Sequence, residues 1–273
     1  MEVVIDMLSF TFMQRALIVG LLVALCASLL GVSLVLKRYA MIGTGLSHVG
    51  FAAMVSATAL GFATLTVSMP IVIASAFLLL RINESSKIKG DSAIALISAS
   101  SLAIGVIIVN ETTGLNTHVC SAMFGSILAM TRADLQISVA LSIIVLVLFV
   151  VFYKQLFAIT YDEDFAKATG TKSGIYKTLL ALLTAVTVVL GMRMMGALLI
   201  SSLIIFPALT AMRLCKSFLS VVIVSAVVAL VCFFVGIVLS FQFALPTGAS
   251  VVSVNLVLFM LFSGIALIKG RLI

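Results

Sequence analysis

His48 is one of only two histidines in this 273-residue chain, and it lies in an apolar segment that begins after the basic pair Lys37 and Arg38. A neutral imidazole is the commonest protein ligand of transition metals. An ionisable side chain at membrane depth is costly without a partner, so it marks a functional site by default. His48 therefore predicts contact with a metal ion. The alternative is that it hydrogen-bonds a neighbouring helix and only holds the helices together.

A second polar pattern occupies residues 161–170, with the sequence YDEDFAKATG. It predicts a short amphipathic helix in a cytoplasmic loop. Asp162 and Glu163 would fall in its first turn, where acidic side chains suit the helix dipole, and Gly170 would end it. The small side chain of Ala166 would let another surface approach closely. An ordinary solvated loop is the alternative, and composition alone favours it.

A third pattern combines Ser201 and Ser202 with Pro207 inside one apolar run. Proline removes a backbone donor in the middle of a helix, so we expect a kink there. The two serines could bond to the freed carbonyl groups or line a polar path through the membrane. The structural role is the favoured one.

Composition identifies the setting of these residues. Hydrophobic residues make up 63% of the chain and charged residues 9%, whereas a soluble domain has about a quarter charged residues. The chain is therefore predicted to be a polytopic membrane protein with a single all-α helical bundle over residues 1–273. About eight to nine transmembrane helices are expected. The candidate apolar segments are 14–36, 45–65, 67–82, 92–109, 134–153, 177–192, 195–213, 217–239 and 250–268.

The basic residues predict the orientation of the bundle. The net charge is +7, but 13 of the 16 lysines and arginines lie in short connections that would all face the cytoplasm, not along one stripe. This placement argues against nucleic-acid binding and puts the N-terminus outside and the C-terminus inside. The number of membrane crossings agrees with this orientation only if the short apolar piece 117–131 does not cross the membrane. We therefore expect a re-entrant or interfacial segment there.

Several sequence patterns are missing. No G-x-x-x-x-G-K-[ST] phosphate-binding motif occurs, so no ATP site is expected on this chain. The only two histidines are predicted to lie on opposite sides of the predicted membrane depth, so no catalytic set of a nucleophile, a histidine and an acid is expected. No series of acidic residues runs through an apolar segment, which weakens a proton-coupled mechanism. We expect a transport subunit without enzymatic activity and without a bound cofactor.

Three separated stretches resemble the permease subunits of bacterial ABC importers for zinc, manganese and iron. Residues 37–50 resemble the family's basic residues followed by Gly-Asp-x-Leu-Ser/Ala-His. Residues 155–170 are similar to the cytoplasmic stretch that ends in Phe-Ala-x-x-x-Gly and docks the ATPase. Residues 195–208, with the sequence MGALLISSLIIFPA, resemble the family's signature around a conserved Pro-Ala pair. The resemblance runs over most of the chain.

The resemblance implies a dimer of permeases in the bacterial cytoplasmic membrane, two cytoplasmic ATP-binding subunits and an extracellular metal-binding protein as partners. It also implies a cytoplasmic coupling segment over 155–176, whose docking residues would be Asp162, Glu163, Phe165, Ala166 and Gly170. The family's first motif uses Asp and His at the metal. Here His48 matches, but Thr44 stands at the Asp position, and a hydroxyl is a far weaker ligand than a carboxylate.

The predicted function is transport of a divalent transition metal driven by a separate ATPase, with zinc as the expected cargo. An imidazole ligand favours zinc over magnesium but does not separate zinc from manganese or iron. The alternative is an ion-coupled secondary transporter that acts without an ATPase. That function predicts acidic residues at membrane depth and inverted repeats, and the sequence has neither. A structural membrane protein would leave His48 and the acidic segment without a role.

Overall fold

The computed structural model describes residues 7–85, 90–112 and 132–268, and every regular element in these ranges is a helix. The first half of the chain forms α2 (Thr11–Leu36), α3 (Ala40–Ala59), α4 (Thr64–Ser85), α5 (Gly90–Glu111) and α7 (Arg132–Val151). The second half forms α8 (Tyr153–Tyr161), α9 (Glu163–Ala168), α10 (Ser173–Met195), α11 (Ala197–Leu214), α12 (Phe218–Phe243) and α13 (Thr247–Ile268). The all-α prediction is confirmed.

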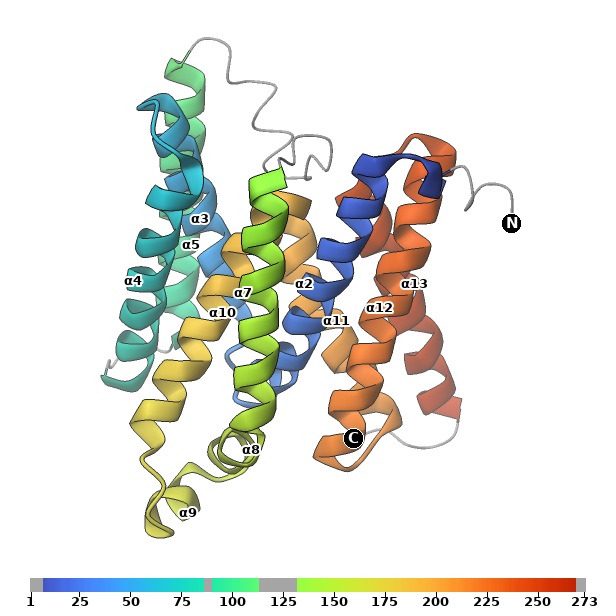
Figure 1. Ribbon diagram of the computed structural model, residues 1–273. Helices are drawn as coiled ribbons and strands as arrows, with labels where there is room; N and C mark the ends of the chain where they lie inside the picture. The colour runs from blue at the N-terminus through green and yellow to red at the C-terminus, as the bar shows by residue number, and fades with distance from the viewer. Residues whose placement is uncertain (1–6, 86–89, 113–131, 269–273) are drawn as a thin grey trace.

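Within the described ranges, eight helices are long and apolar enough to cross a membrane. The helices α7 and α8 together make a ninth candidate, in which the chain bends by 68° between the two. The short helix α8 therefore leaves the direction of the bundle at the end of α7 (Figure 1). These elements form a multi-pass helical membrane bundle, as the composition predicts.

Successive long helices run in alternating directions (Figure 1). The helix α2 begins at the upper end of the bundle in this view, and α13 ends at the lower end, the same end as α8 and α9. The helix α5 ends and α7 begins at the upper end, as the predicted orientation requires. The segment 117–131, expected to be re-entrant or interfacial, lies outside the described residues.

The connection between α10 and α11 is shorter than the sequence suggests. In the sequence, the glycines at 191 and 196 predict a tight turn over residues 191–196. In the structure α10 stays helical to Met195, and the turn is made at Gly196, whose φ is 87°. A Cβ atom on Gly191 would lie 2.3 Å from Cδ1 of Ile200 in α11. Gly191 therefore serves the close packing of the two helices, and one glycine with positive φ is enough for the turn.

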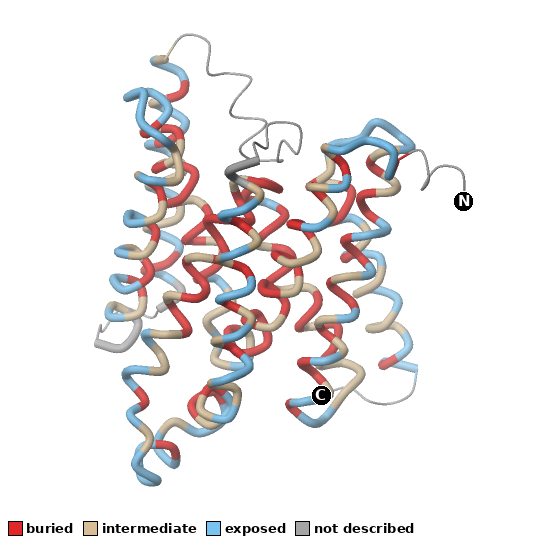
Figure 2. Tube along the Cα trace, viewed as in Figure 1, coloured by how far each residue is buried: buried red, intermediate tan, exposed pale blue. Residues whose placement is uncertain are grey.

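Burial divides the bundle into a central part and a periphery. The helices α2, α10 and α11 are mostly buried, whereas α4, α5 and α13 expose apolar side chains along their outer sides (Figure 2). Exposed leucine, isoleucine and valine are compatible with contact with lipid. The helix that carries His48, α3, packs against α5, α4, α11 and α10 and so lies among the other helices.

Candidate functional site

The imidazole of His48 lies between α3 and α5. Its Nδ1 atom is 2.5 Å from the Oγ atom of Ser98 in α5. The two helices approach closely beside it, because a Cβ on Gly45 would lie only 2.9 Å from Cγ2 of Ile94. His48 is the ninth residue of α3, about 12 Å along the helix from its first residue. The ring thus sits near the middle of a membrane-spanning helix, as the sequence predicts, and it is half-buried.

The bond to Ser98 has a consequence for metal binding. In the tautomer with the proton on Nδ1, the ring donates to Ser98 Oγ and leaves the Nε2 lone pair open for a cation. A group that holds the second ring nitrogen of a ligating histidine fixes the tautomer and the orientation of the ring. Ser98 is in the right place to do this for His48.

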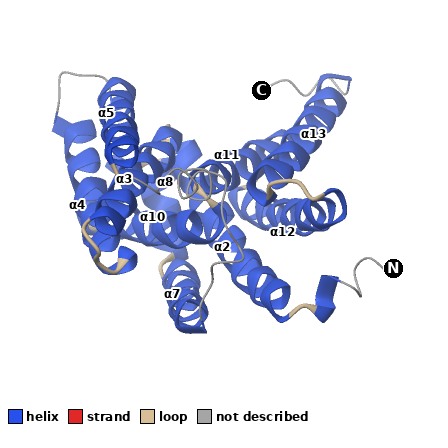
Figure 3. Cartoon of the chain, turned by 90° about the horizontal axis from the view of Figure 1, so that it is seen from above, coloured by secondary structure: helices blue, strands red, loops and turns tan. Residues whose placement is uncertain are grey.

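Two hydroxyl groups connect the same helix to α11. The Oγ atom of Ser47 lies 3.1 Å from that of Ser201 and donates to the carbonyl group of Thr44 at 2.8 Å. Thr44 and Ser201, like His48 and Ser98, are half-buried. We call these four residues the polar face. It runs over α5, α3 and α11, with α3 between the other two (Figure 3).

The serines near Pro207 bond to other carbonyl groups than expected. Ser201 Oγ donates to the carbonyl of Ala197, and buried Ser202 Oγ to that of Leu199. The carbonyl that Pro207 leaves without its helical donor belongs to Leu203, which follows both serines. A serine hydroxyl reaches carbonyls three or four residues earlier, so neither serine can compensate the proline. The helix α11 continues past Pro207 to Leu214.

One copy of the chain does not provide a complete ligand set. Among the described residues, no group of three or more His, Cys, Asp or Glu side chains lies close enough to hold a metal ion. The polar face provides one imidazole and neutral oxygen atoms. Metal sites in proteins use four or more ligands, so a cation at His48 needs further ligands from outside this set.

The segment 161–170 forms a well-capped short helix. Asp162 is the N-cap of α9, and its Oδ1 atom accepts a hydrogen bond from the backbone N–H of Phe165 at 2.9 Å. At the other end, Gly170 has φ 85° and donates to the Lys167 carbonyl, while Thr171 donates to that of Ala166. This is a Schellman motif, in which glycine best fits the left-handed position. The predicted helix over 161–170 is present, with its regular part at 163–168.

The two sides of α9 differ in their surroundings. Phe165 is 66% exposed, at the end of the bundle where α8 and α9 lie. Ala166 is fully buried, so its small side chain lets α9 pack against the chain's own α8 and α10. Glu163 lies on the buried side as well, with only a quarter of its side chain exposed.

The carboxylate of Glu163 is surrounded by lysines. Its Oε1 atom is 2.6 Å from Nζ of Lys177 and 2.9 Å from Nζ of Lys167, and Oε2 is 3.7 Å from Nζ of Lys37. Partial burial would raise the pKa of Glu163. The hydrogen bonds from Lys177 and Lys167, together with the charges of Lys177 and Lys37, outweigh this and lower the pKa to about 2. Glu163 is therefore ionised at physiological pH.

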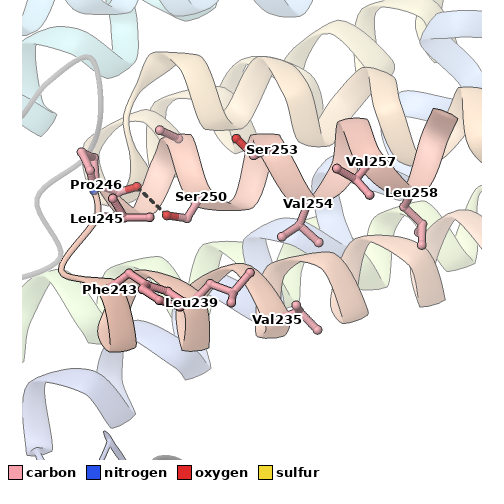
Figure 4. Close-up of a pocket in the computed structure, with 11 residues that line it drawn as sticks. Val235, Leu239, Phe243, Leu245, Pro246, Ser250, Ser253, Val254, Val257 and Leu258 are labelled. Carbon is pink, nitrogen blue, oxygen red and sulfur yellow. Dashed lines mark hydrogen bonds between the residues drawn. The ribbon is translucent and has the colours of Figure 1, made fainter. Parts of the chain in front are cut away.

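A groove between α12 and α13 has a different chemistry (Figure 4). Its volume is about 600 Å³. The polar side chains in it are two serines, and the Ser250 hydroxyl already donates to the Pro246 carbonyl. Such a groove suits hydrocarbon and is not a metal site. Its lining residues are Val235, Leu239, Phe243, Leu245, Pro246, Ala249, Ser250, Ser253, Val254, Val257 and Leu258.

Sequence reasoning missed the partners of both sites. Ser98 is one of several serines in an apolar segment, and no spacing rule connects it with a histidine fifty residues earlier. Lys37 and Lys177 count in the sequence only as loop charges that set orientation. The one sequence feature that hints at their contacts is their position at the ends of apolar segments, from which a lysine side chain can reach a neighbouring loop.

Comparisons with known proteins agree with the helical arrangement. The model of the family described as the ABC 3 transport family matches residues 9–266. The chain is 28% identical to the manganese import system permease protein ScaB of Streptococcus gordonii, over 92% of this chain and 90% of that protein. It is 27% identical to a probable iron transport system membrane protein of Haemophilus influenzae, over 98% of each. A chain of the solved structure of PsaBC from Streptococcus pneumoniae in complex with Fab superposes with a TM-score of 0.85, at 28% identity, over 96% of this chain and 94% of that one.

Proposed function

Because the chain belongs to the ABC 3 transport family, and is thus a permease of metal ABC importers in the bacterial cell membrane, we propose that it moves divalent transition metals inward past His48, driven by a separate ATPase subunit. In this proposal residues 1–273 form one permease domain, with a cytoplasmic coupling segment over 155–176. The chain itself hydrolyses no ATP. An extracellular metal-binding protein delivers the cargo.

The observation that carries the proposal is the His48–Ser98 pair near the middle of the membrane-spanning helix α3. In the tautomer that donates from Nδ1 to Ser98, the pair leaves Nε2 open for a cation on a face that is half-buried and lined with hydroxyl groups. Polar side chains within a membrane face protein or water, because contact with lipid is costly for them. The polar face therefore fits a translocation path better than a lipid-facing surface.

A second copy of the permease would complete this path. The described part of one copy lacks a set of three or more strong ligands, and Thr44 contributes a neutral oxygen where a carboxylate would bind more strongly. Two copies with their polar faces toward each other would place two imidazoles and several hydroxyls around one cation. This arrangement would also cover the half-buried side chains of α3, α5 and α11.

The ATPase would dock on α9. Exposed Phe165 offers an aromatic anchor of the kind that dominates protein interfaces, and Asp162 and Gly170 hold the short helix that presents it. ATP binding and hydrolysis would displace α9. The permease would then alternate between conformations that open the polar face to one side of the membrane at a time.

The cargo is the open part of the proposal. Imidazole nitrogen binds zinc, iron and manganese, and zinc is the sequence-based expectation. The two relatives compared above are named for manganese and iron transport. The proposal therefore specifies a divalent transition metal, with zinc tested against the other two.

Reconstitution tests the proposal. The permease, the cognate ATPase and the binding protein are placed in liposomes, and ATP-dependent uptake of Zn²⁺, Mn²⁺ and Fe²⁺ is measured. We expect uptake of at least one metal, loss of most of it in His48→Ala, and normal uptake in Ser56→Ala, because the Ser56 hydroxyl donates to the Ala52 carbonyl of the same helix. Full uptake by His48→Ala would refute the path. Uptake that needs no ATPase would favour a secondary transporter.

A further inference from the structure

Glu163 does not share the exposed position of Phe165, although the two residues are two apart on α9. Three quarters of its side chain is covered, and its oxygens meet Lys37 and Lys177. These two lysines are themselves only 7% and 10% exposed. A carboxylate that is held from the permease side by two nearly buried lysines is poorly placed to bind another protein.

The two lysines belong to different membrane helices. Lys37 is the C-cap of α2, and Lys177 lies in the second turn of α10. Glu163 therefore bridges α9 to both. We call Glu163, Lys37 and Lys177 the clasp. Because water is largely excluded from it, its charges attract one another more strongly than a surface ion pair would.

Both helices of the clasp lead to α3. After Lys37 the chain turns within two residues: Arg38 has φ 61°, and Tyr39 donates to the Leu34 carbonyl at 2.7 Å before α3 begins at Ala40. This compact turn couples the end of α2 to the start of α3. The helix α10 touches α3 higher in the bundle, where a Cβ on Gly50 would lie 2.5 Å from Cε of Met192. A shift of α2 and α10 would thus move the helix that carries His48.

We propose that Glu163 is a positioning residue that fastens the coupling helix α9 to α2 and α10, so that a displacement of α9 by the ATPase is transmitted to α3 instead of being absorbed by the loop. The proposal rests on the function proposed above and adds a role for the buried side of α9. The exposed side binds the ATPase, and the clasp passes the movement on. Glu163 itself contacts no ATPase.

The test measures metal ions transported per ATP hydrolysed, in the reconstituted full complex. Glu163→Gln removes the charge but keeps the shape of the side chain. Asp164→Asn is the matched control, since Asp164 is 96% exposed and, among the described residues, pairs with Lys167, at 3.6 Å. We expect Glu163→Gln to assemble with the ATPase and hydrolyse ATP while its transport ratio falls at least about fivefold. Asp164→Asn should keep the wild-type ratio, because any change in ATPase binding alters transport and hydrolysis together and leaves their ratio unchanged.

Lys177→Gln breaks the same contact from the other side and serves if Glu163→Gln does not fold. It should lower the transport ratio in the same way. A covalent link provides the rescue. In a chain that carries Cys120→Ser and Cys215→Ser and keeps the buried Cys26 and Cys232, the Glu163→Cys/Lys177→Cys double variant should regain the ratio when a short bifunctional thiol reagent joins the two new thiols. The unlinked double variant should not.

The outcomes separate the two proposals. A wild-type complex without ATP-dependent uptake refutes the proposed function. A working wild type with an unchanged ratio in Glu163→Gln and Lys177→Gln refutes the clasp alone. Loss of ATPase binding in Glu163→Gln, with hydrolysis lost in proportion, would also overturn the clasp, because it would place Glu163 in the docking surface. A link between 163 and 177 that blocks transport would likewise overturn the clasp, because it would show that the contact has to open during transport.

Discussion

The bond between Ser98 and His48 allows a sharp prediction about metal affinity. Ser98→Ala removes the hydroxyl that lies 2.5 Å from Nδ1 and leaves the imidazole in place. A hydrogen bond between membrane helices contributes about 1 kcal/mol, so the variant should stay folded. Loss of the group that orients a ligating histidine costs about 10–100-fold in metal affinity. Ser98 is neutral and only half-buried, so we expect the lower end, a tenfold loss or about 1.4 kcal/mol.

The assay is equilibrium binding of the transported metal to the purified full complex, with thermal unfolding of the same samples as a check on folding. Ser98→Thr keeps the hydroxyl and should bind as the wild type does. Ser100→Ala is the control on the same helix, because the Ser100 hydroxyl is exposed and bonds to the carbonyls of Leu96 and Ile97.

Two results would refute the reasoning. Unchanged affinity in Ser98→Ala would mean that the ring is held by something else or does not bind the metal. An equal loss in Ser98→Ala and Ser100→Ala would mean that any change in α5 disturbs the site. In either case Ser98 would lose its role as the residue that orients His48.

The remaining predictions concern helix packing, ATPase docking and the pH dependence of stability. Gly31→Ala should destabilise the permease by about 2 kcal/mol in thermal unfolding: the added Cβ would lie 2.1 Å from the Ile204 carbonyl oxygen, a steric conflict that costs about 3 kcal/mol, and the higher helix propensity of alanine offsets only about 1 kcal/mol of it. Gly264→Ala, with open space around the added Cβ, is the control, and equal stability of the two variants would contradict this prediction. Phe165→Ala should weaken ATPase binding at least about tenfold without changing the unfolding temperature, because the side chain is 66% exposed; unchanged assembly would place the docking surface elsewhere. Because the folded-state pKa of Glu163 is about 2, below its ordinary 4.5, its stabilisation is complete above pH 4.5 and is lost as the pH falls toward 2. The stability difference between wild type and Glu163→Gln should be constant from pH 8 to about 5 and shrink below 4.5; a constant difference down to pH 3 would contradict the lowered pKa.

The predicted bundle matches the structure in the number and order of spans, but not at every helix end. Apolar composition marks the residues at hydrocarbon depth, whereas backbone geometry sets where a helix stops. The third helix shows the difference: the apolar segment 45–65 predicts its span, but the helix occupies Ala40–Ala59. It begins after the left-handed residue Arg38 and ends before Gly61, whose φ is 73°. Glycine is the residue that usually marks a left-handed helix end, so the arginine at position 38 does not predict where α2 stops and α3 begins.

The candidate site was predictable in its centre but not in its surroundings. His48 stands out because an imidazole is rare and costly in an apolar segment. Asp162 and Gly170 follow from helix-capping preferences, which act within a few residues. Ser98, Lys37 and Lys177 act through contacts with residues far away in the chain. Those contacts depend on how the helices pack, and no local pattern encodes that.

The neutral character of the polar face bears on how the metal would pass. The nine acidic residues lie before the first apolar segment, at the ends of the segments or between them. Thr44 brings a hydroxyl close to His48 in sequence, at the position where the family that the chain resembles has a carboxylate. A divalent cation bound by imidazole and hydroxyl groups keeps its charge uncompensated by protein carboxylates, so it binds weakly. Weak binding suits a path, because an ion that is to cross must leave as readily as it enters. Net transport would then depend on the conformational change, and the proposed clasp at Glu163 would link that change to the helix that carries His48.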